Sequence, residues 1–306
     1  MQGAQYNLIV ILGPTASGKT KLAVRLASEI RSEIISADSR QVYRGMDIGT
    51  GKDLKEYVVE GVYVPYHLID IVDPEHEFSV FEYQQRFLEC FSEISSRGIV
   101  PVMVGGTGLY IESVIMGYRM MAVPENSALR IELEKEDMQT LTRRLLHMDP
   151  SVHNITDLLD RKRLVRAIEI KEFTKLHKHE EAIATSITPL VIGVRWERSI
   201  LRQRITSRLE ERLRSGMIEE VRRLNDSGIA WDKLDFFGLE YRYIGLYLQG
   251  RMNYDDMFEK LNTRIHQFAK KQETWFRRME KRGIHINWVN GEDYIQIKEV
   301  VERVIK

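Results

Sequence analysis

Short apolar runs alternate with segments of helical periodicity in the first third of the chain. The runs Leu8–Leu12, Glu33–Ala37 and Ile99–Val104 predict strands, because they are short and are bounded by polar or turn-forming residues. Apolar residues at helical spacing predict helices over Lys19–Ile30 and Val80–Arg97. Such alternation is typical of a parallel sheet buried on both faces. A ligand is then expected at the carboxyl ends of the strands.

The pattern changes in the middle of the chain. Between residues 120 and 187 the apolar runs disappear, charged residues become frequent and helical spacing dominates. An apolar run returns at Leu190–Arg195 and predicts another strand. We therefore predict a small all-helical domain over 120–187, inserted into an α/β core that consists of residues 1–119 and 188–306.

Two long helices are predicted in the last third, each with an apolar stripe that is expected to face the core. The first stripe consists of Leu201, Ile205, Leu209 and Leu213. The second stripe consists of Met257, Leu261, Ile265, Phe268, Gln272, Trp275 and Met279. A polar row follows the other side of the second helix: Lys260, Arg264, Gln267, Lys271, Thr274 and Arg278.

The first predicted strand runs directly into a glycine-rich turn and the start of a helix. This turn has the pattern GxxxxGK[ST] and consists of Gly13, Pro14, Thr15, Ala16, Ser17, Gly18, Lys19 and Thr20. The glycines let backbone N–H groups point at phosphate oxygens, and the helix N-terminus favours negative charge. Lys19 supplies a cation, and the Thr20 hydroxyl is a candidate Mg²⁺ ligand. The pattern predicts a P-loop NTPase-like sheet with helices on both faces and a di- or triphosphate site.

Two other strand ends carry polar groups that would lie at the same edge of the sheet. Asp38 follows the second strand, where it could bind Mg²⁺ through water, accept a proton from a nucleophile, or simply cap a turn. Gly105–Gly108 follows the third strand and places the Thr107 hydroxyl beside the phosphate, although a purely structural turn fits this sequence equally well. A third glycine-rich stretch, Asp47–Lys52, has no preceding strand and is interpreted as a mobile loop near the site.

The composition of the chain indicates a globular protein of the cytoplasm. Hydrophobic residues make up 43% of the 306, enough for a substantial core. No run of about 18 apolar residues occurs, so no membrane span is expected. The first strand begins too early to leave room for a signal peptide. Cys90 is the single cysteine, which excludes an internal disulfide and fits the cytoplasm.

The zero net charge conceals a strong asymmetry. Residues 1–120 contain 11 basic and 15 acidic residues, a charge of −4, so the remainder carries +4. Two windows are strongly basic: 161–178 has 7 basic and 2 acidic residues, and 260–282 has 8 and 2. Such blocks suit a polyanionic partner, although solvated helix faces can look the same. Neither the NKxD sequence of guanine-specific GTPases nor a metal-binding histidine spacing is present.

Taken together, the motifs resemble the tRNA dimethylallyltransferase (isopentenyltransferase) family, bacterial type. The stretches that carry the resemblance are Gly13–Thr20, Ser36–Ser39, Gln41–Thr50, Pro65–Asp70, Val104–Tyr110, Arg163–Glu169 and Ala269–Arg277. The resemblance implies that the loop binds the diphosphate of dimethylallyl diphosphate, with Mg²⁺ as cofactor. The acceptor would be the N6 amine of the adenosine directly 3′ of the anticodon (position 37) in tRNA.

The resemblance also assigns roles to residues. It implies that Asp38 takes the proton of the amine, that Thr107 lies beside the reacting groups, that Lys19 neutralises the leaving group, and that Arg130 lies on the substrate path. Thr20 would hold the metal. The residues implied to contact tRNA are Asp38, Ser39, Arg40, Gln41, Thr107, Arg130, Lys162, Arg163, Arg166, Arg242, Lys270, Lys271, Gln272, Trp275 and Arg277.

The chain departs from the family pattern at three places. Phe237–Tyr243, with Glu240, replaces a frequent Val-Gly-Tyr-[Arg/Lys]-[Gln/Glu] motif, the residues before Ala269 are shifted, and Tyr66 stands where histidine is usual. Three alternatives stay open on the residues alone: a P-loop small-molecule kinase, a prenyltransferase acting on free adenine nucleotides, and a non-enzymatic RNA-binding protein. None of the three accounts for both the two basic blocks and the intact loop. We expect a monomer.

Overall fold

The computed structural model describes residues 6–150, 158, 160–177, 186–291 and 293–305. The chain divides into two compact units, which are described separately. The larger unit consists of Met1–Tyr118 with Thr185–Lys306, and the smaller one of Arg119–Ala184. The smaller unit therefore coincides, within a few residues, with the segment 120–187 in which the sequence loses its apolar runs.

The larger unit is built on a six-stranded sheet in which all neighbouring strands are parallel. From one edge to the other the strands are β5 (Tyr66–His67), β2 (Ile34–Ala37), β6 (Val102–Gly105), β1 (Leu8–Leu12), β7 (Pro189–Arg195) and β8 (Ile286–Asn290). The predicted parallel sheet is thus confirmed, and β5 and β8 at its edges are additional. Leu12 and Ala37, the last residues of β1 and β2, are both level with Gly105, the last residue of β6, so these three strands end at the same edge of the sheet.

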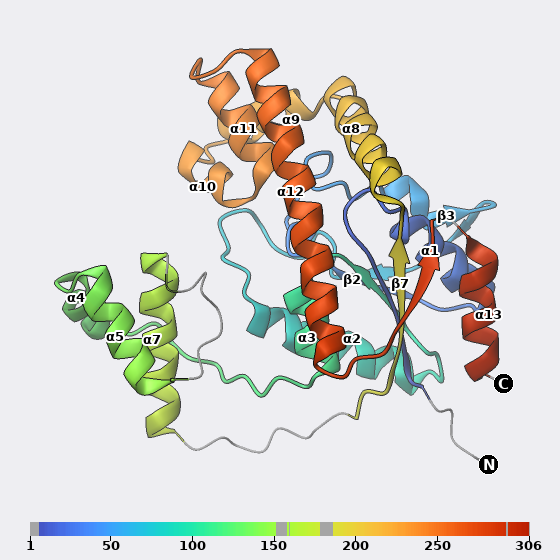
Figure 1. Ribbon diagram of the computed structural model, residues 1–306, viewed down its shortest axis with the longest axis horizontal. Helices are drawn as coiled ribbons and strands as arrows, with labels where there is room; N and C mark the ends of the chain where they lie inside the picture. Colours follow the sequence, from blue (N-terminus) through green and yellow to red (C-terminus); the bar gives the residue numbers. More distant parts are fainter. Residues whose placement is uncertain (1–5, 151–157, 159, 178–185, 292, 306) are drawn as a thin grey trace. The chain divides into compact units, whose positions relative to one another are not determined.

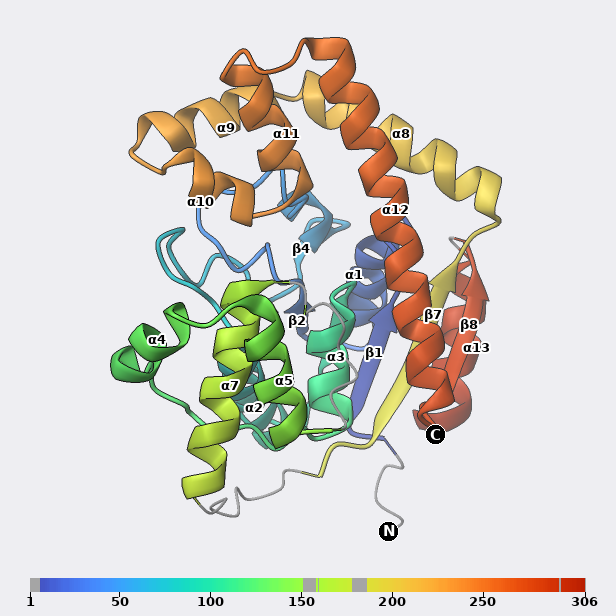
Figure 2. The same ribbon diagram turned by 60° about the vertical axis from the view of Figure 1, so that its left-hand side comes forward.

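Alternate residues of each strand enter two separate cores. On β1, Ile9 and Ile11 pack into one core with α1 (Lys19–Glu29) and α13 (Tyr294–Ile305). Leu8, Val10 and Leu12 enter the other, and the helices that share it are α2 (Val80–Ser96), α3 (Gly108–Ile115) and α12 (Tyr254–Lys281). Figure 1 shows β7 between α12 and α13, and Figure 2 shows β1 beside β7. The sheet is therefore covered on both faces, as its continuous apolar strands require.

The remaining elements of the larger unit surround the carboxyl end of the sheet. They are the helices α8 (Arg198–Arg214), α9 (Met217–Asp226), α10 (Trp231–Phe236) and α11 (Leu239–Leu248), the short η1 (Leu54–Tyr57), and the hairpin of β3 (Val58–Val59) and β4 (Val62–Tyr63). The predicted stripe of α8 is buried. On α12 the prediction is wrong at Phe268, which is exposed, because the helix turns Ala269 and Phe276 inward instead.

The smaller unit is helical, with its own core. It contains α4 (Ser127–Glu134), α5 (Met138–Met148) and α7 (Arg161–Leu176), and a side chain caps each N-terminus: Asn126, Asp137 and Asp160. Leucines of all three helices, together with Ile168, form the core. Among the helices of both units, as far as the described residues go, none is long and apolar enough to cross a membrane.

Candidate active site

The glycine-rich turn Gly13–Thr20, the predicted anion cradle, leads from β1 into α1. Gly13 is required there, because a Cβ atom would lie 2.8 Å from Ser17 Oγ and 2.9 Å from the Val194 carbonyl oxygen. Gly18 has a φ of 81° and begins α1 without a side-chain cap. The first N–H groups of α1 are therefore left for a bound anion. The Ser17 hydroxyl is buried and has no partner among the described residues, so it adds a further donor.

Lys19 lies across this cradle. Its Nζ donates to the Pro14 carbonyl at 3.3 Å and lies 3.5 Å from where a Cβ atom on Gly106 would stand. The amine therefore faces both the first and the third strand ends. Desolvation, followed by repulsion from Arg208, lowers the pKa of Lys19 to about 8. The carboxylates of Asp38 and Glu56 offset only part of this effect, so an anion that enters the cradle would stabilise the charged amine further.

The ends of β2 and β6 are joined by hydrogen bonds. Thr107 Oγ1 accepts from the Ser39 N–H at 3.0 Å, and Asp38 Oδ1 accepts from the N–H groups of Arg40 at 2.9 Å and Gln41 at 3.4 Å. Asp38 thus does cap a turn with one oxygen. Its Oδ2 atom accepts no hydrogen bond within the described chain, so this second oxygen can receive a proton from a ligand.

Gln272, on α12, fixes the cradle to the turn after β6. Its Oε1 accepts from the Thr15 N–H at 2.8 Å, and its Nε2 donates to the Gly106 carbonyl at 2.9 Å. The side chain is buried, with 7% exposed, so both polar atoms are used within the protein. We therefore assign Gln272 a positioning role in place of the predicted contact with tRNA.

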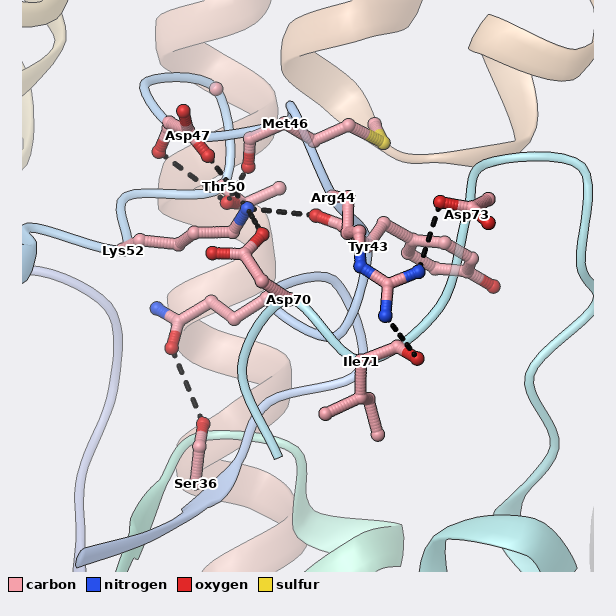
Figure 3. A network of polar contacts seen from close by, with 12 residues as sticks. Ser36, Tyr43, Arg44, Met46, Asp47, Thr50, Lys52, Asp70, Ile71 and Asp73 are labelled. Carbon is pink, nitrogen blue, oxygen red and sulfur yellow. Dashed lines mark hydrogen bonds and ion pairs between the residues drawn. The ribbon is translucent and has the colours of Figure 1, made fainter. Parts of the chain in front are cut away.

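The Asp47–Lys52 loop is firmly anchored, which corrects the expectation of a mobile loop. Figure 3 shows the buried Lys52 amine among the Tyr43 carbonyl, at 2.7 Å, and the carboxylates of Asp47 and Asp70. On the other side, the Glu220 carboxylate accepts from three consecutive backbone N–H groups, those of Asp47 to Gly49, at 2.7–2.9 Å. Buried charge-assisted hydrogen bonds of this kind make the loop a rigid wall.

Sequence reasoning missed three arginines that α8 directs toward this region. Arg204 Nε donates to the Ala16 carbonyl at 2.9 Å, Arg208 forms an ion pair with Asp53, and Arg212 lies beside Gly51. The signal was present in the sequence, because the arginines recur every four residues and each precedes a residue of the apolar stripe.

The other predicted tRNA contacts of the larger unit differ in their surroundings. Lys270, Lys271 and Arg277 are exposed on α12. Trp275 is half-buried: a Cβ atom on Gly108 would lie 2.3 Å from its ring, and Arg278 stacks on its other side at 3.9 Å. The others belong to turns or pairs: Arg242 binds Asp235, the Gln41 amide donates to the Gly51 carbonyl, and Arg40 stacks over Phe236 at 5.1 Å.

The remaining predicted contacts lie in the smaller unit. Lys162 and Arg163 are exposed. Arg130 and Arg166 both bind the carboxylate of Glu169, a buried residue, at 2.8–2.9 Å. Although burial opposes it, these hydrogen bonds lower the pKa of Glu169 to about 2. Arg130 therefore has a structural partner in addition to any role toward a substrate.

Comparisons with known proteins agree in one family. Residues 41–279 match the family model described as IPP transferase, and residues 6–70 match the one described as isopentenyl transferase. The chain is 62% identical, over 96% of each chain, to tRNA dimethylallyltransferase 1 of Syntrophus aciditrophicus. It is 55% identical to tRNA dimethylallyltransferase 2 of Trichlorobacter lovleyi, over 93% of this chain and 92% of the relative.

Solved structures give the same result. The tRNA isopentenylpyrophosphate transferase of Bacillus halodurans is 31% identical, with a TM-score of 0.70 and coverage of 98% of this chain and 96% of that one. A eukaryotic dimethylallyltransferase that acts on tRNA, at 21% identity and a TM-score of 0.76, shares the fold over 97% of this chain and 77% of its own.

Proposed function

The chain belongs to the IPP transferase family and is a prenyl-transferring enzyme, and on this premise we propose its reaction. It transfers the dimethylallyl group of dimethylallyl diphosphate to the N6 amine of the adenosine directly 3′ of the anticodon (position 37) in tRNA. The products are N6-isopentenyladenosine in tRNA and diphosphate.

One observation carries the proposal. The carboxyl ends of three adjacent parallel strands bring the glycine-rich cradle, a carboxylate and a hydroxyl to one edge of the sheet. Gln272 links the cradle to the turn after β6, and Thr107 links that turn to the Asp38 turn. Donor and acceptor can therefore be held by groups whose relative positions are fixed by hydrogen bonds, which is the main requirement of a two-substrate transfer.

In the transfer, the N6 lone pair forms a bond to the allylic carbon while the bond from that carbon to the diphosphate oxygen breaks. The leaving diphosphate receives the electron pair, and Lys19 and the N–H groups of the cradle stabilise its charge. The proton of the amine moves to the free Oδ2 of Asp38. Thr107 holds the Asp38 turn in place through the Ser39 N–H.

Mg²⁺ fits this cradle as an ion that both the protein and the phosphate oxygens of the donor would bind. The Thr20 hydroxyl is partly exposed in the first turn of α1, and no hydrogen bond occupies it within the described residues. Those residues hold no group of three His, Cys, Asp or Glu side chains suited to a metal. Thr20 would therefore hold the ion with phosphate oxygens and water, and the ion would neutralise the leaving group.

The exposed cations supply the tRNA side of the proposal. Lys270, Lys271 and Arg277 on α12, and Lys162 and Arg163 in the smaller unit, are available to phosphates. The target base must leave its stack, at a cost of about a few kcal/mol, before its amine can reach Asp38. We propose that the protein works as a monomer in the cytoplasm. Burial raises the pKa of the Cys90 thiol to about 11, so this cysteine stays protonated and inert.

The deciding experiment supplies labelled dimethylallyl diphosphate, Mg²⁺ and unmodified tRNA. Digestion of the tRNA is expected to yield labelled N6-isopentenyladenosine. Label on free AMP instead of tRNA would replace the proposal with an adenylate prenyltransferase. Turnover of ATP without prenyl transfer would replace it with a P-loop small-molecule kinase.

A further inference from the structure

The three arginines of α8 form a ladder beside the cradle. Arg204, Arg208 and Arg212 are spaced four residues apart, so they share one face of the helix. The first binds the cradle through the Ala16 carbonyl, and the second is held by the Asp53 carboxylate. The third arginine, Arg212, has no comparable hydrogen-bonded partner among the described residues.

Arg212 is enclosed and poorly compensated. Only 13% of its side chain is exposed, and its Nε is buried without a hydrogen bond. Its Nη2 lies so close to Gly51 that a Cβ atom on that residue would be 1.5 Å from the nitrogen. The facing carboxylate is that of Glu240, at 3.9 Å from Nη1, which is too long for a hydrogen bond. Desolvation and repulsion from Arg208 lower the pKa of Arg212 to about 10.

Burying a guanidinium without hydrogen bonds costs folding free energy, and the described residues make no hydrogen bond to that of Arg212. Such a group is normally kept for a ligand of opposite charge, and its planar fork matches phosphate oxygens. The ladder leads to the cradle, since Arg212 and Arg208 both approach Gly51 and Arg204 binds the Ala16 carbonyl. The charge of Arg212 also acts on Lys19, after burial, Arg208 and Asp38. The rigid Asp47–Lys52 loop keeps the guanidinium in this position.

We propose that Arg212 binds the diphosphate of the isoprenoid donor as a third cation beside Lys19 and Arg208, and that Glu240 holds Arg212 between turnovers. This inference rests on the proposed function. Glu240 lies within Phe237–Tyr243, where the chain departs from the family pattern, and its carboxylate supplies a counter-charge to Arg212. Its negative charge also opposes the bound anion and favours release of diphosphate.

The test measures binding of inorganic pyrophosphate by calorimetry. Arg212→Gln is expected to weaken binding by about tenfold or more, the effect of losing a hydrogen bond to a charged group. Glu240→Gln is expected to strengthen it by about threefold or more, because a repelling charge is removed. The double variant should bind more weakly than Glu240→Gln and somewhat more tightly than Arg212→Gln, because the repelling charge is removed there as well. Arg214→Gln, two residues further along α8 and exposed, is the matched control and should bind like the parent.

Opposite signs for the two single variants separate this role from a structural one. If the pair only supported the fold, both variants would weaken binding, and the inference would be overturned. Thermal unfolding shows whether each variant is folded. If Arg212→Gln fails to fold, Arg212→Lys takes its place: this variant keeps the charge and should retain part of the affinity for pyrophosphate. Prenyl transfer by the parent protein, together with unchanged pyrophosphate binding by Arg212→Gln, would reject this inference alone. Absence of prenyl transfer by the parent would reject the proposed function.

Discussion

At the scale of single residues, Asp38 shows that a structural and a chemical role can share one side chain. One carboxylate oxygen caps the turn after β2, while the other has no partner among the described residues. The turn holds the carboxylate in place before the acceptor arrives. The two sequence interpretations of Asp38, turn cap and proton acceptor, are therefore compatible.

Replacing Asp38 by Asn should separate these roles. The amide oxygen of Asn can still accept from the Arg40 N–H, so the turn and the fold should persist. Loss of the base is expected to slow the transfer step by about 10²-fold or more. Single-turnover quench with labelled donor measures this step, and fluorescence anisotropy should show tRNA affinity close to that of the parent. A parent-like rate would remove Asp38 from the reaction.

Lys19 predicts a pH dependence of diphosphate binding. Its pKa is lowered to about 8 in the free protein, so the amine loses its charge as the pH rises through that value. A bound anion favours the charged amine and raises its pKa again. Affinity should therefore fall above about pH 8, and binding there should take up a proton.

Calorimetry in buffers of different ionisation enthalpy detects this proton uptake. Lys19→Met is the control, because it retains the protonation changes of the ligand but lacks the amine. Equal uptake by the parent and the variant would show that Lys19 stays charged in the free protein.

At the scale of elements, α12 serves the site from both of its sides. Its buried side ends on Gln272, which joins two loops, and its exposed side carries the cations Lys270 and Lys271. A 28-residue helix can do this because its two sides meet different surroundings. The helix thereby connects the cradle with the surface proposed for tRNA.

Truncation of Gln272 tests this division. Gln272→Ala leaves the Thr15 N–H and the Gly106 carbonyl without their partner, so the free energy of unfolding should fall by about 1–3 kcal/mol. The KM for the donor should rise, while tRNA affinity should be unchanged. Urea denaturation and steady-state kinetics measure these effects, with the exposed Gln267→Ala as the control on the same helix. Weakened tRNA binding at parent-like stability would instead restore Gln272 as an RNA contact.

At the scale of the whole molecule, the distribution of charge matters more than the zero net charge. The first 120 residues carry −4, and the excess of positive charge lies in the later part of the chain. Exposed cations occur in α7 of the smaller unit and in α12 of the larger one. Binding of a tRNA phosphate backbone should therefore depend steeply on salt.

Lys271→Ala should weaken tRNA binding and reduce the slope of log K against log salt by about one unit. Lys298→Ala provides the control, because this lysine lies on α13, against the opposite face of the sheet from α12. Titrations over a range of salt concentrations give both slopes. A slope for Lys271→Ala equal to that of the parent would mean that this side chain faces away from the RNA.

The sequence determined the central parallel strands, because these arise from short-range periodicity, and it predicted the glycine-rich turn and the helical segment 120–187 from local turn chemistry and a change in that periodicity. It did not reveal β8, whose sequence INWVN mixes polar and apolar residues at a sheet edge. It also placed Phe268 inside, since residues 268 and 269 fit the stripe almost equally well.

Only the tertiary structure decided which polar side chains serve the protein and which are left for substrates. The contacts that decide this join residues far apart in the chain: Gln272 meets Thr15 across 257 positions, and Glu220 meets the Asp47 loop across more than 170. Local patterns carry no information on such pairs, because the fold brings them together only when the sheet and its helices assemble. Within the described part of the chain, the Arg212 Nε that lacks a hydrogen bond and the free oxygen of Asp38 could be recognised only after those pairs were known.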